Sequence, residues 1–207
     1  MNGRLYDLFT AIAERKVLGE LRASLISPLR GSIVEVGAGT GASFPYYPSS
    51  ARVLAVEPDP SMFKRAERRA PEAAADVKVM QASDTLLDEL PEGSAEHIVA
   101  TLVLCSVSDP SVTLRRLHRV LGANGTYVFV EHVRADRLTG RVQDALTPLW
   151  RRLSGNCHLN RDFEFALREA GFRIVRLHKR KLPFPIGYLL YGTAEKSTQS
   201  HIWAPTS

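Results

Sequence analysis

Two features of the sequence have the residue types and spacing to bind a cofactor that carries a nucleoside. The stretch Gly37-Ala38-Gly39-Thr40-Gly41 directly follows the β-branched run 33–36. Glycines permit a tight turn out of a strand, and they let a ligand approach backbone N–H groups without a Cβ in the way. Glu57 ends the next β-branched run, where a carboxylate can accept hydrogen bonds from both ribose hydroxyls. Together these features predict a nucleoside site at the mouth of two neighbouring strands.

The same residues leave the kind of cofactor open. Gly37, Gly39 and Ala42 also fit a loose G-x-G-x-x-A dinucleotide fingerprint, so an NAD-dependent oxidoreductase remains an alternative. The G-x-G-x-G spacing instead favours a cofactor with an amino-acid moiety and no pyrophosphate. A non-catalytic binding module is a further alternative, and the intact glycine turn and Glu57 argue against it.

Strands and helices alternate around these residues. Five strands are predicted by β-branched or apolar runs at 33–36, 53–56, 77–80, 98–104 and 126–130. Helices are predicted over 5–29, after Asp59-Pro60, after Asp109-Pro110 and, capped by Asn160, over 163–170. Two last strands, 174–175 and 188–191, are joined only by the loop 179–187, so an antiparallel pair is expected. This order predicts an α/β fold with a Rossmann-like, doubly wound sheet of seven strands, mostly parallel with an antiparallel last strand.

Composition narrows the class of protein. The 207 residues, 44% of them apolar, suit one domain over 1–195 with a flexible tail over 196–207. The two cysteines are too few for a disulfide framework and lack the spacing of a zinc motif, so no metal site is expected. No apolar run approaches the roughly 20 residues of a membrane span, which predicts a cytoplasmic protein with at most peripheral membrane contact. The sequence has no basic patch with interleaved aromatic residues, so no nucleic-acid partner is expected.

With the run Ile33-Val34-Glu35-Val36 leading into the glycine turn, nearly the whole chain resembles the class I S-adenosylmethionine-dependent methyltransferases of type 11. The stretch 121–125, Leu-Gly-Ala-Asn-Gly, is a variant of that group's L-x-P-G-G turn. Several stretches resemble those of one branch of this group, which includes alkyl-thiol methyltransferases of animal membranes. They are the runs 101–107 and 131–133, together with Trp150, 155–157 and Arg161. Bacterial relatives of this branch are often labelled phospholipid or quinone methyltransferases. The chain departs from the pattern at Ser43, where an asparagine is usual. An N-terminal membrane anchor like that of the animal proteins is not expected, and a small or accessible substrate is.

The resemblance implies S-adenosylmethionine as cofactor and a helical lid over residues 1–30. It places Ser83 and Asp84 near adenine, although Asp84 could equally cap a helix. The expected cofactor contacts are Glu35, Gly37, Ala38, Gly39, Thr40, Gly41, Glu57, Pro58, Ala82, Ser83, Asp84 and Leu102.

Methyl transfer from a sulfonium is an in-line displacement, so the protein supplies positioning, desolvation and, where the nucleophile needs one, a base. The candidate catalytic residues are His132, Tyr6 and His158, with structural roles for His132 and Tyr6 as alternatives. Cys105, Cys157 and Arg161 are expected at the substrate pocket, with Arg161 either holding an anionic group or bonding a helix end. A thiol, with a pKa of about 8.5, needs little help to ionise and is the favoured small-molecule acceptor. N-methylation of a phospholipid amine and C- or O-methylation of a quinone-like or secondary-metabolite substrate are the alternatives.

Overall fold

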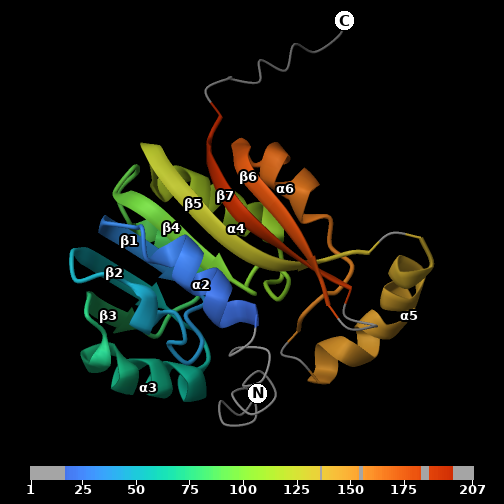
Figure 1. Cartoon of the computed structure of the whole chain (residues 1–207), viewed down its shortest axis with the longest axis horizontal. Coiled ribbons are helices and arrows are strands. Elements are labelled where there is room, and N and C mark those ends of the chain that lie inside the picture. Colours follow the sequence, from blue (N-terminus) through green and yellow to red (C-terminus); the bar gives the residue numbers. More distant parts are fainter. Residues whose placement is uncertain (1–16, 136, 154–155, 183–186, 198–207) are drawn as a thin grey trace, which may run out of the picture.

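The centre of the molecule is a seven-stranded sheet with the order β3-β2-β1-β4-β5-β7-β6 (Figure 1). The computed structural model describes residues 17–135, 137–153, 156–182 and 187–197. The strands are β1 Gly31–Val36, β2 Ala51–Val56, β3 Asp76–Met80, β4 Ala95–Thr101, β5 Leu121–Val133, β6 Phe172–Lys181 and β7 Tyr188–Lys196. The α-helices are α2 Gly19–Ile26, α3 Pro60–Arg69, α4 Pro110–Val120, α5 Arg137–Leu153 and α6 Phe163–Glu169. The described residues also contain three 3₁₀ turns: η2 Phe44–Tyr46, η3 Ala70–Glu72 and η4 Asp84–Glu89.

The sheet is covered by helices on both faces. Along β1, Val34 and Val36 pack on one side in a cluster with residues of α4 and α6, whereas Ile33 packs on the other in a cluster with residues of α2 and α3. Alternate residues of a strand point to opposite faces, so a strand that buries both must be apolar nearly throughout. The predicted doubly wound α/β fold is confirmed.

The last two strands set the antiparallel end of the sheet. β1 to β5 pair in parallel, while β7 runs antiparallel to both β5 and β6. The predicted topology, with an antiparallel last strand, is confirmed. Lys196 still belongs to β7 and pairs with Phe172, so the strand extends one residue past the expected boundary of the tail.

Several predicted element boundaries are wrong for identifiable reasons. β4 ends at Thr101 instead of residue 104, because the backbone N–H groups that follow bind a side chain of β5. Asp162, not Asn160, caps α6 by accepting from the Phe165 N–H, while Asn160 donates to Asp144. α5 was not predicted from the sequence, and it contains Pro148. In Figure 1 it lies beyond the end of β5, away from the centre of the sheet.

Candidate active site

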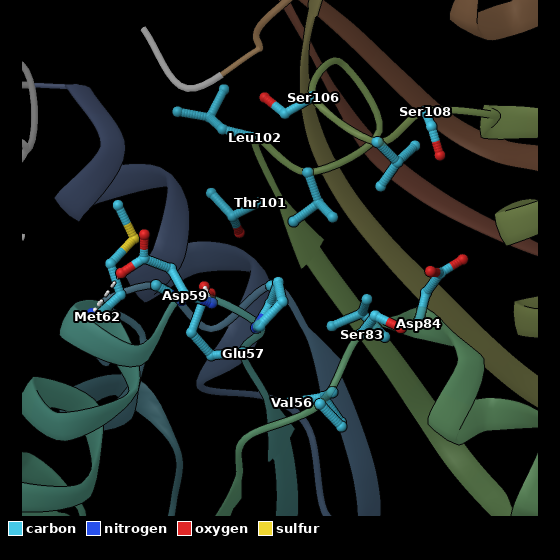
Figure 2. A pocket seen from close by; sticks show the side chains of 17 residues that line it. Val56, Glu57, Asp59, Met62, Ser83, Asp84, Thr101, Leu102, Ser106 and Ser108 are labelled. Atoms are coloured by element: carbon cyan, nitrogen blue, oxygen red, sulfur yellow. Dashed lines mark hydrogen bonds between the residues drawn. The ribbon is translucent and has the colours of Figure 1, made fainter. Parts of the chain in front are cut away.

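A cavity of about 370 Å³ opens at the carboxyl ends of β1, β2 and β4. In an open α/β sheet this edge is where ligands bind, beside the point at which the strand order reverses. Figure 2 shows Glu57, Asp59 and Met62 along one wall, with Ser83 and Asp84 across from them. Eight of the expected cofactor contacts line the cavity: Gly37, Gly39, Glu57, Pro58, Ala82, Ser83, Asp84 and Leu102.

Two positions of the glycine turn require glycine for different reasons. Gly37 and Gly39 both have a positive φ, at 66° and 59°, which side chains rarely adopt. A Cβ on Gly37 would lie 2.5 Å from a methyl group of Val103, so this glycine is needed for packing. A Cβ on Gly39 would meet no atom within 4 Å, and it would enter the space in which a ligand approaches the backbone. Both glycines line the cavity, and Gly39 is the one at which a Cβ would point into open space.

Glu57 connects the glycine turn to the loop after β2. Its carboxylate accepts hydrogen bonds from the Gly39 N–H at 2.8 Å and the Asp59 N–H at 2.9 Å. The residue is 5% exposed, and burial raises the pKa of its carboxyl above the ordinary value. Each carboxylate oxygen has more than one lone pair, so both can accept a ligand hydroxyl in addition to the backbone. The carboxylate is held in one orientation at the wall of the cavity.

Four expected cofactor contacts lie in the turn or beneath it. The described residues that line the cavity do not include Glu35, Ala38, Thr40 or Gly41. Glu35 is fully buried in β1, and Thr40 accepts a hydrogen bond from Arg69 at 3.0 Å. A Cβ on Gly41 would lie 2.7 Å from the ring of Phe44. These residues support the turn from behind.

Asp84 lines the cavity and is also held by α4. Its Oδ2 accepts from the Thr113 hydroxyl at 2.6 Å and pairs with Arg116 at 2.9 Å. Ser83, not Asp84, is the N-cap of η4, since its side chain accepts from the Thr85 N–H. The cavity wall includes Asp59 and Met62 as well, two residues that the sequence did not indicate as contacts.

The loop after β4 is organised around Glu131, which is fully buried near the end of β5. Its carboxylate accepts three consecutive backbone N–H groups, from Val103 at 3.0 Å, Leu104 at 2.9 Å and Cys105 at 3.1 Å. Leu102, at the start of the loop, has a φ of 60°, a strained value for a residue with a side chain. Glu131 entered the sequence predictions only as part of the family-like run 131–133. A carboxylate directly after the buried apolar run 128–130 is the signal that could have indicated its role.

Arg161 braces the same loop from the segment before α6. Its guanidinium donates to the carbonyl oxygens of Leu104 and Val107, the latter at 2.6 Å. His158 donates from Nδ1 to the Cys105 carbonyl at 3.1 Å. Asn156 donates to the Ser106 carbonyl at 2.7 Å. Both predicted residues, Arg161 and His158, thus hold the backbone that borders the cavity.

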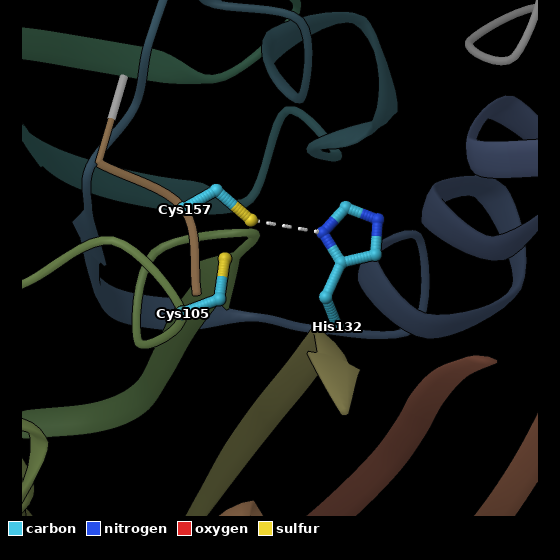
Figure 3. Close-up of side chains that lie close together, drawn as sticks. All are labelled: Cys105, His132 and Cys157. Atoms are coloured by element: carbon cyan, nitrogen blue, oxygen red, sulfur yellow. Dashed lines mark hydrogen bonds between the residues drawn. The ribbon is translucent and has the colours of Figure 1, made fainter. Parts of the chain in front are cut away.

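Cys105, His132 and Cys157 come together beside this loop. The Cys157 Sγ lies 3.5 Å from the His132 Nδ1, as Figure 3 shows. The hydrogen bond to Cys157 and burial raise the pKa of Cys105, while the hydrogen bond from Cys105 lowers the pKa of Cys157. Among the described residues, none of the three lines the cavity at the ends of β1, β2 and β4, although the neighbouring Leu102 and Ser106 do. Tyr6 and most of the expected lid lie outside the described residues.

Comparison with known proteins identifies the family. A family model described as a methyltransferase domain matches residues 34–129, the stretch that holds the glycine turn and Glu57. The thiol S-methyltransferase TMT1A of Homo sapiens is 32% identical over 187 residues, which cover 86% of this chain and 75% of the relative. The chain belongs to the class I S-adenosylmethionine-dependent methyltransferases. The family resemblance seen in the sequence is confirmed.

Further relatives of this methyltransferase agree in family and fold. The thiol S-methyltransferase TMT1B of Rattus norvegicus is 32% identical over 210 residues, with 93% of this chain and 84% of the relative covered. A solved geranyl diphosphate methyltransferase in complex with S-adenosylmethionine superposes with a TM-score of 0.67 at 17% identity, covering 86% of this chain and 83% of that structure. At that identity the likeness concerns the fold alone. Within its described part, the methyltransferase has no helix whose length and apolar character suit a membrane crossing.

Proposed function

We propose that this methyltransferase transfers the methyl group of S-adenosylmethionine to the sulfur of a small-molecule thiol. The observation that carries the proposal is the similarity to thiol S-methyltransferases, which covers 86% or more of the chain and includes the acceptor side of the sheet. A thiol also demands the least of the protein, because a thiol with a pKa near 8.5 is partly ionised at neutral pH.

The cofactor cavity fits a nucleoside with an amino-acid moiety. We assign Glu57 to the ribose hydroxyls, since both of its oxygens are fixed by backbone N–H groups at the cavity wall. Gly39 lets the amino-acid portion approach the backbone of the turn, because no side chain fills that space. Pro58, Ala82 and Leu102 supply apolar surface, and Ser83 and Asp84 supply polar groups for the adenine. When bound, S-adenosylmethionine supplies an electrophilic methyl carbon on a sulfonium.

The acceptor side is assigned to the loop after β4 and the end of β5. Glu131 and Arg161 fix this loop, so the residues that border the acceptor are held rigidly beside the cofactor cavity. His132, at the end of β5, is the candidate base or polar contact for the acceptor thiol. Cys105 and Cys157 are pocket residues, and methyl transfer requires no enzyme nucleophile. Tyr6 and the N-terminal lid remain predictions.

A two-part experiment tests the proposal. The first part measures the melting temperature with S-adenosylmethionine, with its demethylated product, and with NAD. Ligand at about 100 times its Kd stabilises by about 2.7 kcal/mol, an easily measured shift. We expect a shift with the first two ligands only, and a shift with NAD alone would overturn the cofactor assignment.

The second part identifies the acceptor. Alkyl thiols, phospholipid amines, phenols and quinols are offered side by side with the methyl donor, and methylated products are detected by mass spectrometry. We expect product from the thiols, with Glu57→Ala as a control that lowers the rate for every acceptor by weakening donor binding. Turnover of amines or quinols without turnover of thiols would contradict the thiol assignment and leave the cofactor assignment intact.

A further inference from the structure

Three potential metal ligands from three separate segments lie close together on the proposed acceptor side, by the loop after β4 and the end of β5. Cys105 lies in the loop after β4, His132 near the end of β5, and Cys157 in the segment after α5. The Cys105 Sγ, the Cys157 Sγ and a ring nitrogen of His132 all lie within 4.8 Å of one another. Figure 3 shows both sulfur atoms and the His132 ring turned toward the same point. The spacing of these residues along the sequence gave no zinc motif, because only the fold brings them together.

The separation of the Cys157 Sγ and the His132 Nδ1 suits a tetrahedral ion. With a Zn–S bond of about 2.3 Å and a Zn–N bond of about 2.0 Å, a sulfur and a nitrogen ligand lie about 3.5 Å apart at the tetrahedral angle. The Cys157 Sγ and the His132 Nδ1 are 3.5 Å apart. Two thiolates also cancel the charge of a divalent cation, so that the cluster is neutral with the ion bound.

The surroundings hold the ligands in place. The backbone N–H of Cys105 is fixed by Glu131 at 3.1 Å, and its carbonyl accepts from His158. Trp150 packs against the cluster that contains Cys105, Cys157 and Leu159. Outer contacts of this kind fix the orientation of metal ligands and are worth about 10- to 100-fold in metal affinity. Cys105 is 2% exposed and Cys157 is 6% exposed, so both thiols are screened from bulk water.

We propose that Cys105, Cys157 and His132 bind one thiophilic divalent cation of the Zn²⁺ type, with three protein ligands. On binding, each thiol loses its proton to solvent and each sulfur donates an electron pair to the ion, with no change of oxidation state. The neutral His132 donates from Nδ1 and keeps its proton on Nε2. Three protein ligands leave one coordination position of a tetrahedral ion for an exogenous group, as in catalytic zinc sites.

The fourth position gives the ion a role in the proposed reaction. This step rests on the proposed function, because it assumes that the acceptor is a thiol. An acceptor thiol that coordinates the ion would lose its proton to solvent, and methyl transfer to its sulfur yields a thioether and the demethylated cofactor product. The ion thus takes the place of His132 as the group that favours the thiolate. His132 is a ligand in this arrangement and not a base.

Cobalt(II) tests the site directly, because thiolate ligands give Co²⁺ an intense near-ultraviolet charge-transfer band and tetrahedral geometry gives strong visible bands. The full chain is reduced, stripped with a chelator and titrated with Co²⁺, and Zn²⁺ is then added in competition. We expect one Co²⁺ per chain with both sets of bands, and their loss on adding one equivalent of Zn²⁺. Absence of the thiolate band in the reduced protein would overturn the proposal.

Variants assign the ligands. We expect Cys105→Ser, Cys157→Ser and His132→Asn each to weaken Co²⁺ binding by more than about 100-fold, since loss of a direct ligand exceeds the effect of an outer contact. His178→Asn is the matched control, because His178 is an exposed histidine of β6 that stacks on Tyr191. Circular dichroism and binding of the demethylated cofactor product check that each variant is folded. Folded cluster variants that bind Co²⁺ as tightly as the control would overturn the assignment.

The metal proposal and the proposed function can fail separately. Co²⁺ binding is measured without donor or acceptor, whereas thiol methylation is measured by its product. If a chain that binds no Co²⁺ methylates thiols at an undiminished rate, the metal proposal is contradicted and the proposed function stands. If a chain that binds Co²⁺ tightly methylates only amines, the metal site is supported and the thiol assignment is contradicted.

Discussion

The cofactor side and the acceptor side of the sheet edge place their functional groups in different ways. On the cofactor side, one short stretch and one acid 18 residues away are joined by a hydrogen bond from a backbone N–H to the Glu57 carboxylate. On the acceptor side, the groups that meet come from β5 and from segments 25 to 57 residues apart, and they are held by buried side chains. A site built on a contiguous turn can be found in the sequence, whereas a site assembled by side chains from distant segments becomes visible only in the fold.

The largest expected effect concerns Glu131, which holds the loop of the acceptor side. Glu131→Gln replaces one of the oxygens that accept three backbone N–H groups by an NH₂ donor. A buried N–H group left without an acceptor costs about 1–3 kcal/mol, and one or two of the three lose theirs, so we expect the free energy of unfolding to fall by about 3–5 kcal/mol. Urea denaturation measures this. The control is Glu195→Gln, which breaks an exposed pair with Arg173 and should cost less than about 1 kcal/mol. Equal losses would mean that Glu131 does not organise the loop.

Glu35 gives the second largest effect, on the cofactor side. Burial raises the pKa of Glu35 from 4.5 to about 7. A raised folded-state pKa means that the stability is fully present below the unfolded pKa and is lost as the pH rises through about 7. Between about pH 5 and about pH 8 this loss amounts to about 2–3 kcal/mol.

Glu35→Gln should remove that pH dependence, because the amide stays neutral. We expect the difference in unfolding free energy between the two pH values to shrink by about 2–3 kcal/mol, measured by urea denaturation. Glu67→Gln, on the exposed face of α3, should leave the pH dependence unchanged. A variant less stable than the parent at the higher pH would show that an ionised Glu35 is favourably paired, with Arg22 as the charged neighbour.

Glu57→Ala tests whether the two sides act independently. We expect the affinity for the demethylated cofactor product to fall by about 1–3 kcal/mol, or roughly 5- to 150-fold, through lost hydrogen bonds to a charged group. Isothermal titration calorimetry measures the affinity. His132→Asn, on the acceptor side, should change it by less than about twofold, since His132 is not among the described residues that line the cavity. A large effect of His132→Asn would show that the two sides are coupled.

The successes and errors of the sequence predictions follow this same division. The sequence predicted the doubly wound α/β fold, the antiparallel end of the sheet, and the glycine turn with Glu57. These features depend on periodicity and on residues that are close in the sequence. The early end of β4 was not, since it depends on the distant Glu131. Asn160 and Asp162 are both good N-caps, and local propensity alone could not choose between them. α5 was missed because Gly140 and Pro148 weaken its helical pattern.

The smallest expected effect compares two helix caps with the same hydrogen-bond pattern. Asp59 accepts from the N–H groups of Ser61 and Met62 at 2.9 and 3.0 Å, and Asp109 accepts from those of Ser111 and Val112 at 2.9 and 3.2 Å. Replacing either aspartate by alanine should cost about 1 kcal/mol of unfolding free energy, the usual value of such a cap.

The two cap variants should differ in cofactor affinity. The Asp59 side chain lines the cavity and fixes the first turn of α3, next to the backbone N–H that the Glu57 carboxylate accepts, whereas Asp109 is not among the described residues that line the cavity. We therefore expect Asp59→Ala to weaken binding of the demethylated product by a fewfold and Asp109→Ala to leave it unchanged, both measured by calorimetry. Equal affinities with equal losses of stability would mean that the first turn of α3 does not contribute to the cofactor site. Glu57 and Gly39 would then carry the ribose and backbone contacts without the support of that helix.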